Sequence, residues 1–303
     1  MEAQPDEEYM ETAITDAEGG EEELIKLLHI KGEDADDDDE DHNKKENKNL
    51  EELEEIIGYK FDNKSLLEEA FTHSSACSSS SSSSRSSYER LEFVGDAVLN
   101  LLISKEHYFL YPELSSGPLT RLRSANVDTE KLARVAVKHG LHRFLRHTKP
   151  CLEEEITKFT QEITEFPLHS NGLIDVPKDL ADIVESAIGA VFIDSNSCLD
   201  TVWKVFKSLL EPIISPGTIK MHPVTELYEM CQKNNLNVRF VDLWKKNIGF
   251  HVYIEDQLIG RASYGLKKDI AYNRAAKDAL DNIGRMKNTA SNTTKFSLNT
   301  IKS

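Results

Sequence analysis

The sequence lacks the features of an exported or membrane-spanning chain. No run approaches 18 consecutive apolar residues, which excludes a transmembrane helix of ordinary length. The opening residues MEAQPDEEYMET contain neither a basic nor an apolar segment, so we expect no secretory signal and no Arg/Ser-rich transit peptide. Only four cysteines occur, and none forms a CxxC pair, which indicates free thiols in a reducing compartment. We therefore expect an intracellular protein, in the nucleus, the cytoplasm or both.

Positive charge is scarce overall but unevenly distributed. The chain has 36 Lys and Arg against 53 Asp and Glu, a net charge of −17. Taken alone, this value argues against a nucleic-acid partner, because phosphates bind basic surfaces. Residues 1–49 carry −14, residues 50–220 carry −8 and residues 221–303 carry +5. The acidity therefore describes the N-terminal tail more than the rest of the chain.

Composition and periodicity divide the chain into five parts. Residues 1–49 are predicted to be a disordered acidic tail, with at most a short helix at 24–30. Residues 50–215 carry helical periodicity, which begins with a helix ending at Gly58 and a second one capped by Asn63, and they include a flexible serine-rich loop at 78–87. A Pro/Gly-containing linker follows at 216–222, then a segment in α-β-β-β-α order at 223–285, and a flexible tail at 286–303.

The segment ERLEFVGDAVL, residues 89–99, places acids on an otherwise apolar helix. Glu92 and Asp96 lie four residues apart, so they share one face, and Glu89 lies on nearly the same side. Like charges at this spacing weaken a helix unless a cation lies between them. Gly95 costs about 1 kcal/mol of helix propensity, which predicts a close backbone approach at this point.

A second predicted helix, residues 179–191, repeats this pattern. Asp182 and Glu185 lie three residues apart on one side, and Gly189 and Ala190 would let another helix come close. Carboxylate oxygens are the ligands that Mg²⁺ prefers, and a pair of such ions can promote phosphodiester hydrolysis. The residues alone leave two interpretations open: a shared metal site, or acids on two solvated helix faces.

The ordered motifs resemble those of the ribonuclease III family. Residues 89–99 are similar to the family signature, with Val94 where Leu is usual. Residues 70–74 (AFTHS), residues 117–123 (GPLTRLR) and the segment containing Asp182 and Glu185 resemble three further motifs. Residues 221–285 resemble a double-stranded-RNA-binding domain, and the layout is similar to that of plant ribonuclease III-like proteins. The implied fold is an all-α ribonuclease III endonuclease domain followed by a small α+β (α-β-β-β-α) domain.

The resemblance also implies a metal site and a reaction. The implied metal ligands and catalytic residues are Glu92, Asp96, Asp182 and Glu185, with Glu89 as an auxiliary candidate. The presence of all four acids favours an active enzyme. This enzyme would hydrolyse double-stranded RNA with Mg²⁺, for which Mn²⁺ would substitute, and leave 5′-phosphate and 3′-hydroxyl ends. Precursors of ribosomal RNA and of small RNAs are both compatible substrates.

The family resemblance implies a homodimer. Family members dimerise through the catalytic domain, and this chain has one such domain. Phe93 matches the aromatic residue that is inserted into the partner subunit. The alternative interpretation of Phe93 is an ordinary core aromatic.

The C-terminal domain departs from its family in the residues expected to touch RNA. The candidates for RNA contact are Glu229, His251, Lys267 and Lys268. By this resemblance, Glu229 matches the position that usually reaches the minor groove, and His251 matches the family's loop histidine, although the usual Gly-Pro is missing. Asp269 and Tyr272 replace usual phosphate-binding positions, so we expect weak and salt-sensitive RNA binding.

Two other functions remain open from the sequence. The chain could hold duplex RNA without cutting it, or it could be an interaction scaffold in which the helix pair only dimerises. The four acids favour the enzyme, and the altered lysine positions argue against a pure binding protein. A zinc site at His139, His142, His147 and Cys151 is disfavoured by its irregular spacing. The basic run 143–149 either follows duplex phosphates or ends a solvated helix.

Overall fold

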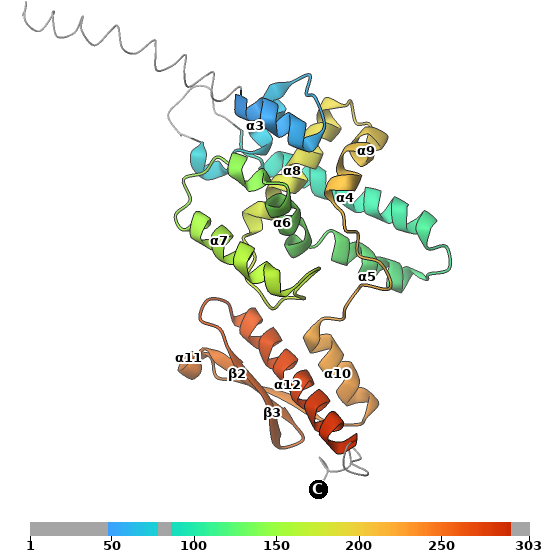
Figure 1. Ribbon diagram of the computed structural model, residues 1–303, viewed down its shortest axis with the longest axis vertical. Helices are drawn as coiled ribbons and strands as arrows, with labels where there is room; N and C mark the ends of the chain where they lie inside the picture. The colour runs from blue at the N-terminus through green and yellow to red at the C-terminus, as the bar shows by residue number, and fades with distance from the viewer. Residues whose placement is uncertain (1–47, 78–85, 292–303) are drawn as a thin grey trace, which may run out of the picture. The chain divides into compact units, whose positions relative to one another are not determined.

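The computed structural model describes residues 48–77 and 86–291 (Figure 1). The predicted acidic tail, its short helix and most of the serine-rich loop lie outside these residues. The described chain consists of a helical segment that ends with a helix at residue 209 and an α+β segment that begins at residue 223. None of the described helices is both long enough and apolar enough to cross a bilayer.

The first two helices of the described residues begin and end where the sequence predicts. A helix covers residues 48–57 and ends at Gly58, whose φ of 76° suits a residue without a side chain. Helix α3 (Lys64–Ala70) begins after Asn63, whose side chain accepts a hydrogen bond from the main-chain nitrogen of Ser65 (3.1 Å). The predicted N-cap is therefore confirmed.

Helix α8 lies at the centre of the helical segment, with α3, α4, α6 and α9 packed around it (Figure 1). The helices that follow α3 are α4 (Glu89–Leu110), α5 (Ser116–Asn126), α6 (Thr129–Lys138), α7 (Leu152–Glu162), α8 (Lys178–Asp194) and α9 (Leu199–Leu209). Short 3₁₀ helices occur at Ser74–Ala76, Leu141–Phe144 and Ile163–Glu165. Most of α8 is buried, including Leu180, Ile183, Val184 and Ile188, and each such side chain contributes about 1.5–3 kcal/mol.

The α+β segment has the predicted element order. Helix α10 (Pro223–Lys233) precedes β1 (Val238–Asp242), β2 (Gly249–Ile254) and β3 (Gln257–Ser263), and α12 (Lys268–Ser291) follows them. The strands form an antiparallel sheet in the order β1-β2-β3, and a one-turn helix, α11 (Trp244–Asn247), lies between β1 and β2. Phe250, Val252 and Ile254 belong to the core that the sheet shares with α10 and α12. At Gly260 a Cβ would lie only 2.6 Å from the main chain of Ala279, so α12 packs directly on β3.

The end of the α+β segment differs from the sequence prediction. A flexible tail was expected from residue 286, but α12 continues to Ser291. The physical reason is that no proline or glycine follows Gly284 to end the helix. The predicted linker at 216–222 contains neither helix nor strand, and a turn joins Ser215 to Thr218 just before and within it.

Helix α4 carries a buried histidine that costs stability. The side chain of His107 is 1% exposed, and neither ring nitrogen has a hydrogen-bond partner among the described residues. Burial holds the pKa of His107 below its ordinary value, while the charge of Glu106 opposes this shift. The unfolded chain therefore binds a proton near pH 6.5 that the folded chain does not bind, and stability falls as the pH decreases through that value.

We expect His107→Leu to stabilise the protein. The substitution removes two unsatisfied polar atoms, so the free energy of unfolding should rise by about 1–2 kcal/mol at pH 7. The loss of stability between about pH 7 and pH 5 should also become smaller. Urea denaturation at several pH values measures both effects. His139→Leu is the control, because the His139 ring bonds the Leu209 carbonyl oxygen (3.1 Å) and its loss should destabilise. A less stable His107→Leu variant would contradict the argument.

Candidate active site

The main chains of α4 and α8 are in direct contact. A Cβ at Gly95 would overlap the carbonyl oxygen of Glu185, and a Cβ at Gly189 would overlap that of Leu91. Only glycine fits at either position, which confirms the predicted close approach. The contact brings the acids of α4 beside those of α8.

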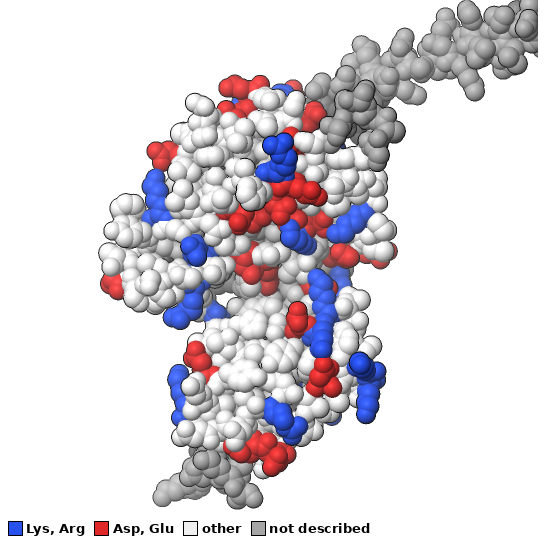
Figure 2. Space-filling view, turned by 180° about the vertical axis from the view of Figure 1, so that it is seen from behind, with Lys and Arg blue, Asp and Glu red and all other residues white. Residues whose placement is uncertain are grey.

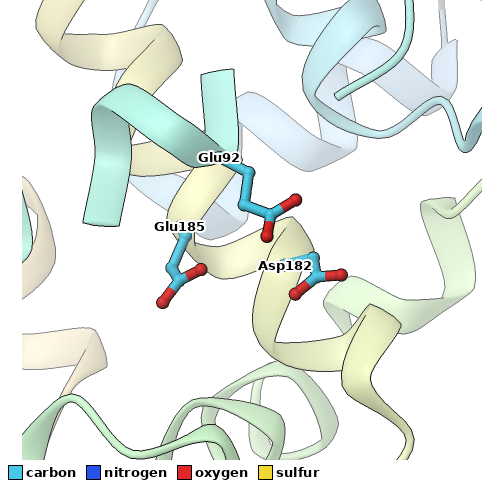
Figure 3. A group of neighbouring side chains, drawn as sticks. All are labelled: Glu92, Asp182 and Glu185. Carbon is cyan, nitrogen blue, oxygen red and sulfur yellow. The ribbon is translucent and has the colours of Figure 1, made fainter. Parts of the chain in front are cut away.

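Three carboxylates converge next to this contact (Figure 3). Oxygen atoms of Glu92 on α4 and of Asp182 and Glu185 on α8 all lie within 4.8 Å of one another. This is the only group of three or more His, Cys, Asp or Glu side chains in the described chain with such spacing. Acidic side chains gather near the middle of the helical segment in Figure 2, with basic side chains beside them. The two helices thus form one cluster rather than two separate acidic faces.

The other two predicted acids lie outside this group. Asp96 is exposed, and its carboxylate accepts a hydrogen bond from the Asn100 side chain (2.8 Å). Its charge still acts on Glu185, because it raises the pKa of that carboxyl. Glu89 is exposed in the first turn of α4. The structure therefore brings together three of the four acids predicted to bind metal.

A lysine that we did not predict lies among the acids. The Lys178 ammonium donates hydrogen bonds to Glu92 Oε1 (2.8 Å) and Asp182 Oδ1 (2.5 Å). Although burial opposes it, the bonds to both carboxylates raise the pKa of Lys178. The ammonium is thus a cation held between two of the three acids. The sequence does contain a signal for this contact, because Lys178 lies four residues before Asp182 and therefore on the same helix face.

A buried tyrosine connects the acidic cluster to a fourth carboxylate. The Tyr88 hydroxyl lies 3.3 Å from both Asp182 Oδ2 and Asp179 Oδ1. Asp179 also accepts a hydrogen bond from the Lys149 ammonium (2.6 Å) and lies 3.3 Å from His73 Nε2. Although burial alone would raise it, the hydrogen bond and charge of the Lys149 ammonium hold the pKa of Asp179 below its ordinary value. Tyr88 therefore joins Asp182 to an ion-paired and firmly held neighbour.

Two of the sequence motifs meet at Asp179. His73 belongs to the AFTHS motif, and Lys149 ends the basic run 143–149. Main-chain hydrogen bonds join these segments, from His73 to Arg146 (2.9 Å) and from Arg146 to Phe71 (2.8 Å). The final lysine of the basic run thus bonds an acid next to the site. No sequence spacing could show this, because the segments lie about 70 residues apart.

The electrostatics of the cluster favour a cation. Burial, followed by the charges of Asp96, Asp182 and Glu92, raises the pKa of Glu185 to about 8. Burial and the charge of Glu92 also raise the pKa of Asp182, against the effect of Lys178. Several partly buried oxygen ligands that repel one another suit a hard divalent cation. The donor set therefore fits a metal ion held by Glu92, Asp182 and Glu185.

Comparison with known proteins identifies the family. The family model "Ribonuclease III domain" matches residues 89–196, and the model "Double-stranded RNA binding motif" matches residues 223–283. Ribonuclease 3-like protein 3 of Oryza sativa subsp. japonica is 52% identical over 232 residues, which cover 76% of this chain and 77% of that protein. The chain belongs to the ribonuclease III family. It is a ribonuclease III-type endoribonuclease, with a ribonuclease III domain followed by a double-stranded-RNA-binding domain.

Other relatives extend this similarity. Ribonuclease 3-like protein 2 of Arabidopsis thaliana is 41% identical over 78% of this chain and 60% of its own length. Endoribonuclease Dicer homolog 1 of the same plant is 45% identical over 75% of this chain, which is only 12% of its own length. Among solved structures, the nuclease domain of ribonuclease III from Campylobacter jejuni is 28% identical, with a TM-score of 0.41. That alignment covers 54% of this chain and 97% of the bacterial one.

In the RNA-binding domain, the four residues predicted to contact RNA do not share one surface. Glu229 on α10, Lys267 just before α12 and Lys268 at its start are exposed. His251 is not a loop residue: it lies in β2, paired with Val241 and Arg261. Because side chains alternate along a strand and Phe250 is in the core, His251 points to the opposite face of the sheet. The loop before β2 contains α11, with Lys245 and Lys246 exposed.

The remaining candidates are also placed by the structure. Phe93 is 79% exposed, so the interpretation as a core aromatic is wrong.

The histidines of the disfavoured zinc site have other partners. His142 lies 3.3 Å from the Ala136 carbonyl oxygen, and His147 lies 3.2 Å from Glu153 Oε1.

We expect Lys178→Met to strengthen the binding of Mg²⁺ to the ribonuclease III domain. The ammonium competes with the cation for two carboxylates, and an ion pair this exposed is worth ~1 kcal/mol. The Mg²⁺ concentration that gives half of the maximal rise in melting temperature should fall about fivefold. Lys149→Met is the matched control, because Lys149 pairs with Asp179 outside the cluster, and it should change this concentration less. Equal concentrations in the wild type and Lys178→Met would contradict the competition.

Proposed function

We propose that the protein is a Mg²⁺-dependent endoribonuclease that hydrolyses double-stranded RNA to 5′-phosphate and 3′-hydroxyl ends. The observation that supports this most strongly is the convergence of Glu92, Asp182 and Glu185 beside the α4–α8 contact. A surface used only for dimerisation would gain nothing from acids that repel one another. Mn²⁺ would substitute for Mg²⁺, since both accept carboxylate ligands.

Each residue of the proposed metal site has a separate role. Glu92, Asp182 and Glu185 would hold the ion, and Asp96 would join them by leaving its bond to Asn100. A bound divalent ion would supply Lewis acidity and neutralise charge that develops on the phosphate. Tyr88 fixes the orientation of the Asp182 carboxylate through its hydroxyl. Lys178, whose side chain is exposed, can turn toward solvent and present its ammonium to a phosphate.

We further propose that the enzyme is a homodimer formed through α4. Phe93, Leu101 and Tyr108 are 79%, 52% and 68% exposed, and their spacing of eight and seven residues places them on one face of the helix. An apolar stripe of this length is unusual on a monomer surface. A second copy would cover it in a symmetric, self-complementary contact.

The proposed substrates are precursors of ribosomal RNA or of small RNAs inside the cell, in the nucleus or cytoplasm. Double-stranded-RNA-binding domains recognise duplex RNA by its shape, through 2′-hydroxyl groups and phosphates rather than through particular bases. Both classes of precursor are therefore compatible substrates. Lys268 is paired with Asp242 (2.6 Å), which supports modest and salt-sensitive affinity at the start of α12.

Glu185→Gln should abolish cleavage while leaving the fold and duplex binding intact. We expect the rate on a labelled long duplex to fall more than about 100-fold, because even residues that merely support metal ligands contribute 10–100-fold. Sequencing of the product ends tests the proposed chemistry in the same assay. Glu155→Gln, on the exposed side of α7, is the matched control and should cut normally. Cleavage by Glu185→Gln at the wild-type rate would disprove the metal-site assignment. A wild-type protein that binds but never cuts would instead support the non-cleaving alternative.

Phe93→Asp should dissociate the dimer. A central aromatic anchor in an interface is commonly worth at least about 2 kcal/mol, so the dimer dissociation constant should rise about 30-fold or more. Sedimentation velocity across a concentration series measures this. Leu266→Asp replaces a side chain of similar exposure (67%) outside α4 and should leave the dimer unchanged. If both variants sediment like the wild type, the α4 stripe is not the interface.

A further inference from the structure

The three-stranded sheet has one face that α10 and α12 do not cover. Its side chains alternate with those of the core, so this outer sheet face consists of residues at every second strand position. Its residues are Arg239, Val241, His251, Tyr253, Leu258, Arg261 and Ser263, and the alternation in β3 shifts by one residue at the bulge opposite Val252 and Tyr253. Val241, His251 and Arg261 stand side by side across the three strands, and Arg239 stands opposite Tyr253.

The cations on the outer sheet face have no acidic partners among the described residues. The Arg239 guanidinium lies over the Tyr253 ring, 4.8 Å from its centroid, an interaction that keeps the charge. The side chain of Arg261 forms no ion pair within the described part of the chain. Asp278 accepts hydrogen bonds from the main-chain nitrogen of Arg261 (2.9 Å) and from the Asn282 side chain (3.3 Å). No Asp or Glu occupies a position of this face within the described strands.

A hollow of about 330 Å³ opens between this face and α11. The hollow is lined by Asn247, His251, Arg261 and Ser263, together with Leu243, Gly249, Phe250 and Ala262. Its polar side chains can all donate hydrogen bonds, and none is a carboxylate. Such a lining suits an anion. At Gly249 a Cβ would overlap the Ala262 carbonyl oxygen, so the glycine lets β2 and β3 pack closely beside the hollow.

The start of α12 is less favourable to an anion. Lys268 is paired with Asp242, and the acidic Asp269 follows it directly. Tyr272 packs against Phe240, with ring centroids 4.1 Å apart, where a phosphate-binding residue was expected. The unpaired positive charge of the three strands therefore lies mostly on the outer sheet face.

We propose that the outer sheet face is a second binding site for the phosphate backbone of duplex RNA, with Arg239 and Arg261 as the main residues that bind it. Arg239 on β1 and Arg261 on β3 lie on the same face of the sheet, and the fixed fork of each guanidinium matches phosphate oxygens. His251 and Asn247 add donors at the edge of the hollow. The domain would thus bind RNA on two opposite sides, one formed by its helices and the other by the outer sheet face.

The salt dependence of binding tests this site. Removing a side chain that binds one phosphate should reduce the slope of log K against log salt concentration by about 1. In the full chain carrying Glu185→Gln to prevent cleavage, adding Arg239→Gln and Arg261→Gln together should lower that slope by about 2. At low salt, the dissociation constant for a blunt RNA duplex should rise about 10-fold or more. Thermal melting confirms that each variant is folded.

The control removes the same charge elsewhere in the domain. Lys233→Gln with Lys277→Gln deletes two lysines that pair with Glu229 and Asp281 on their own helices, and the slope should change little. The proposal is overturned if the arginine variant keeps the wild-type slope, or if both double variants reduce it equally. The measurement needs no metal and no cleavage, so its outcome is independent of the proposed nuclease activity.

Discussion

The close packing of the main chains of α4 and α8 is the constraint on which the rest of the site depends. Gly95 and Gly189 leave no space for a Cβ, so the helices meet at a distance that any side chain would increase. At this distance the Glu92 carboxylate of one helix reaches those of Asp182 and Glu185 on the other. Each glycine within a helix costs about 1 kcal/mol of helix propensity. The three-carboxylate cluster requires this cost, because only glycine allows the two helices to come so close.

The three carboxylates repel one another, and the surrounding residues offset this repulsion only in part. The single charge of Lys178 is shared between Glu92 and Asp182, and the pKa of Asp182 stays raised. Burial and the charges of the neighbouring acids raise the pKa of Glu185 to about 8. On the far side of Asp182, the Tyr88 hydroxyl bridges to Asp179, which is itself fixed by Lys149. Asp179 is therefore held firmly, whereas the negative charges of Glu92, Asp182 and Glu185 are only partly offset. A divalent cation placed among these acids would relieve the repulsion that remains.

Local features of the chain could be predicted because they depend on neighbours in sequence. Helical spacing located the acids of α4 and α8, and the cost of Gly95 within a helix signalled the close approach. Tyr88 and Lys149 could not be assigned roles, since they meet at Asp179 only through tertiary packing. The position of His251 depends on strand register, where a shift of one residue moves a side chain to the other face of the sheet. The length of α12 was underestimated because polar composition resembles a loose tail even when no residue ends the helix.

The net charge of −17 does not conflict with an RNA substrate once the positions of the charges are known. Phosphates would be repelled by the carboxylate cluster unless a cation and Lys178 stood between them. The affinity for RNA therefore has to come from other surfaces, and the residues after 220 carry the positive excess. Within them, pairing with Asp242 offsets the charge of Lys268, whereas Arg239 and Arg261 keep theirs. The acids proposed to hold a metal ion and the arginines proposed to bind phosphates are thus far apart along the chain, where their charges do not offset one another.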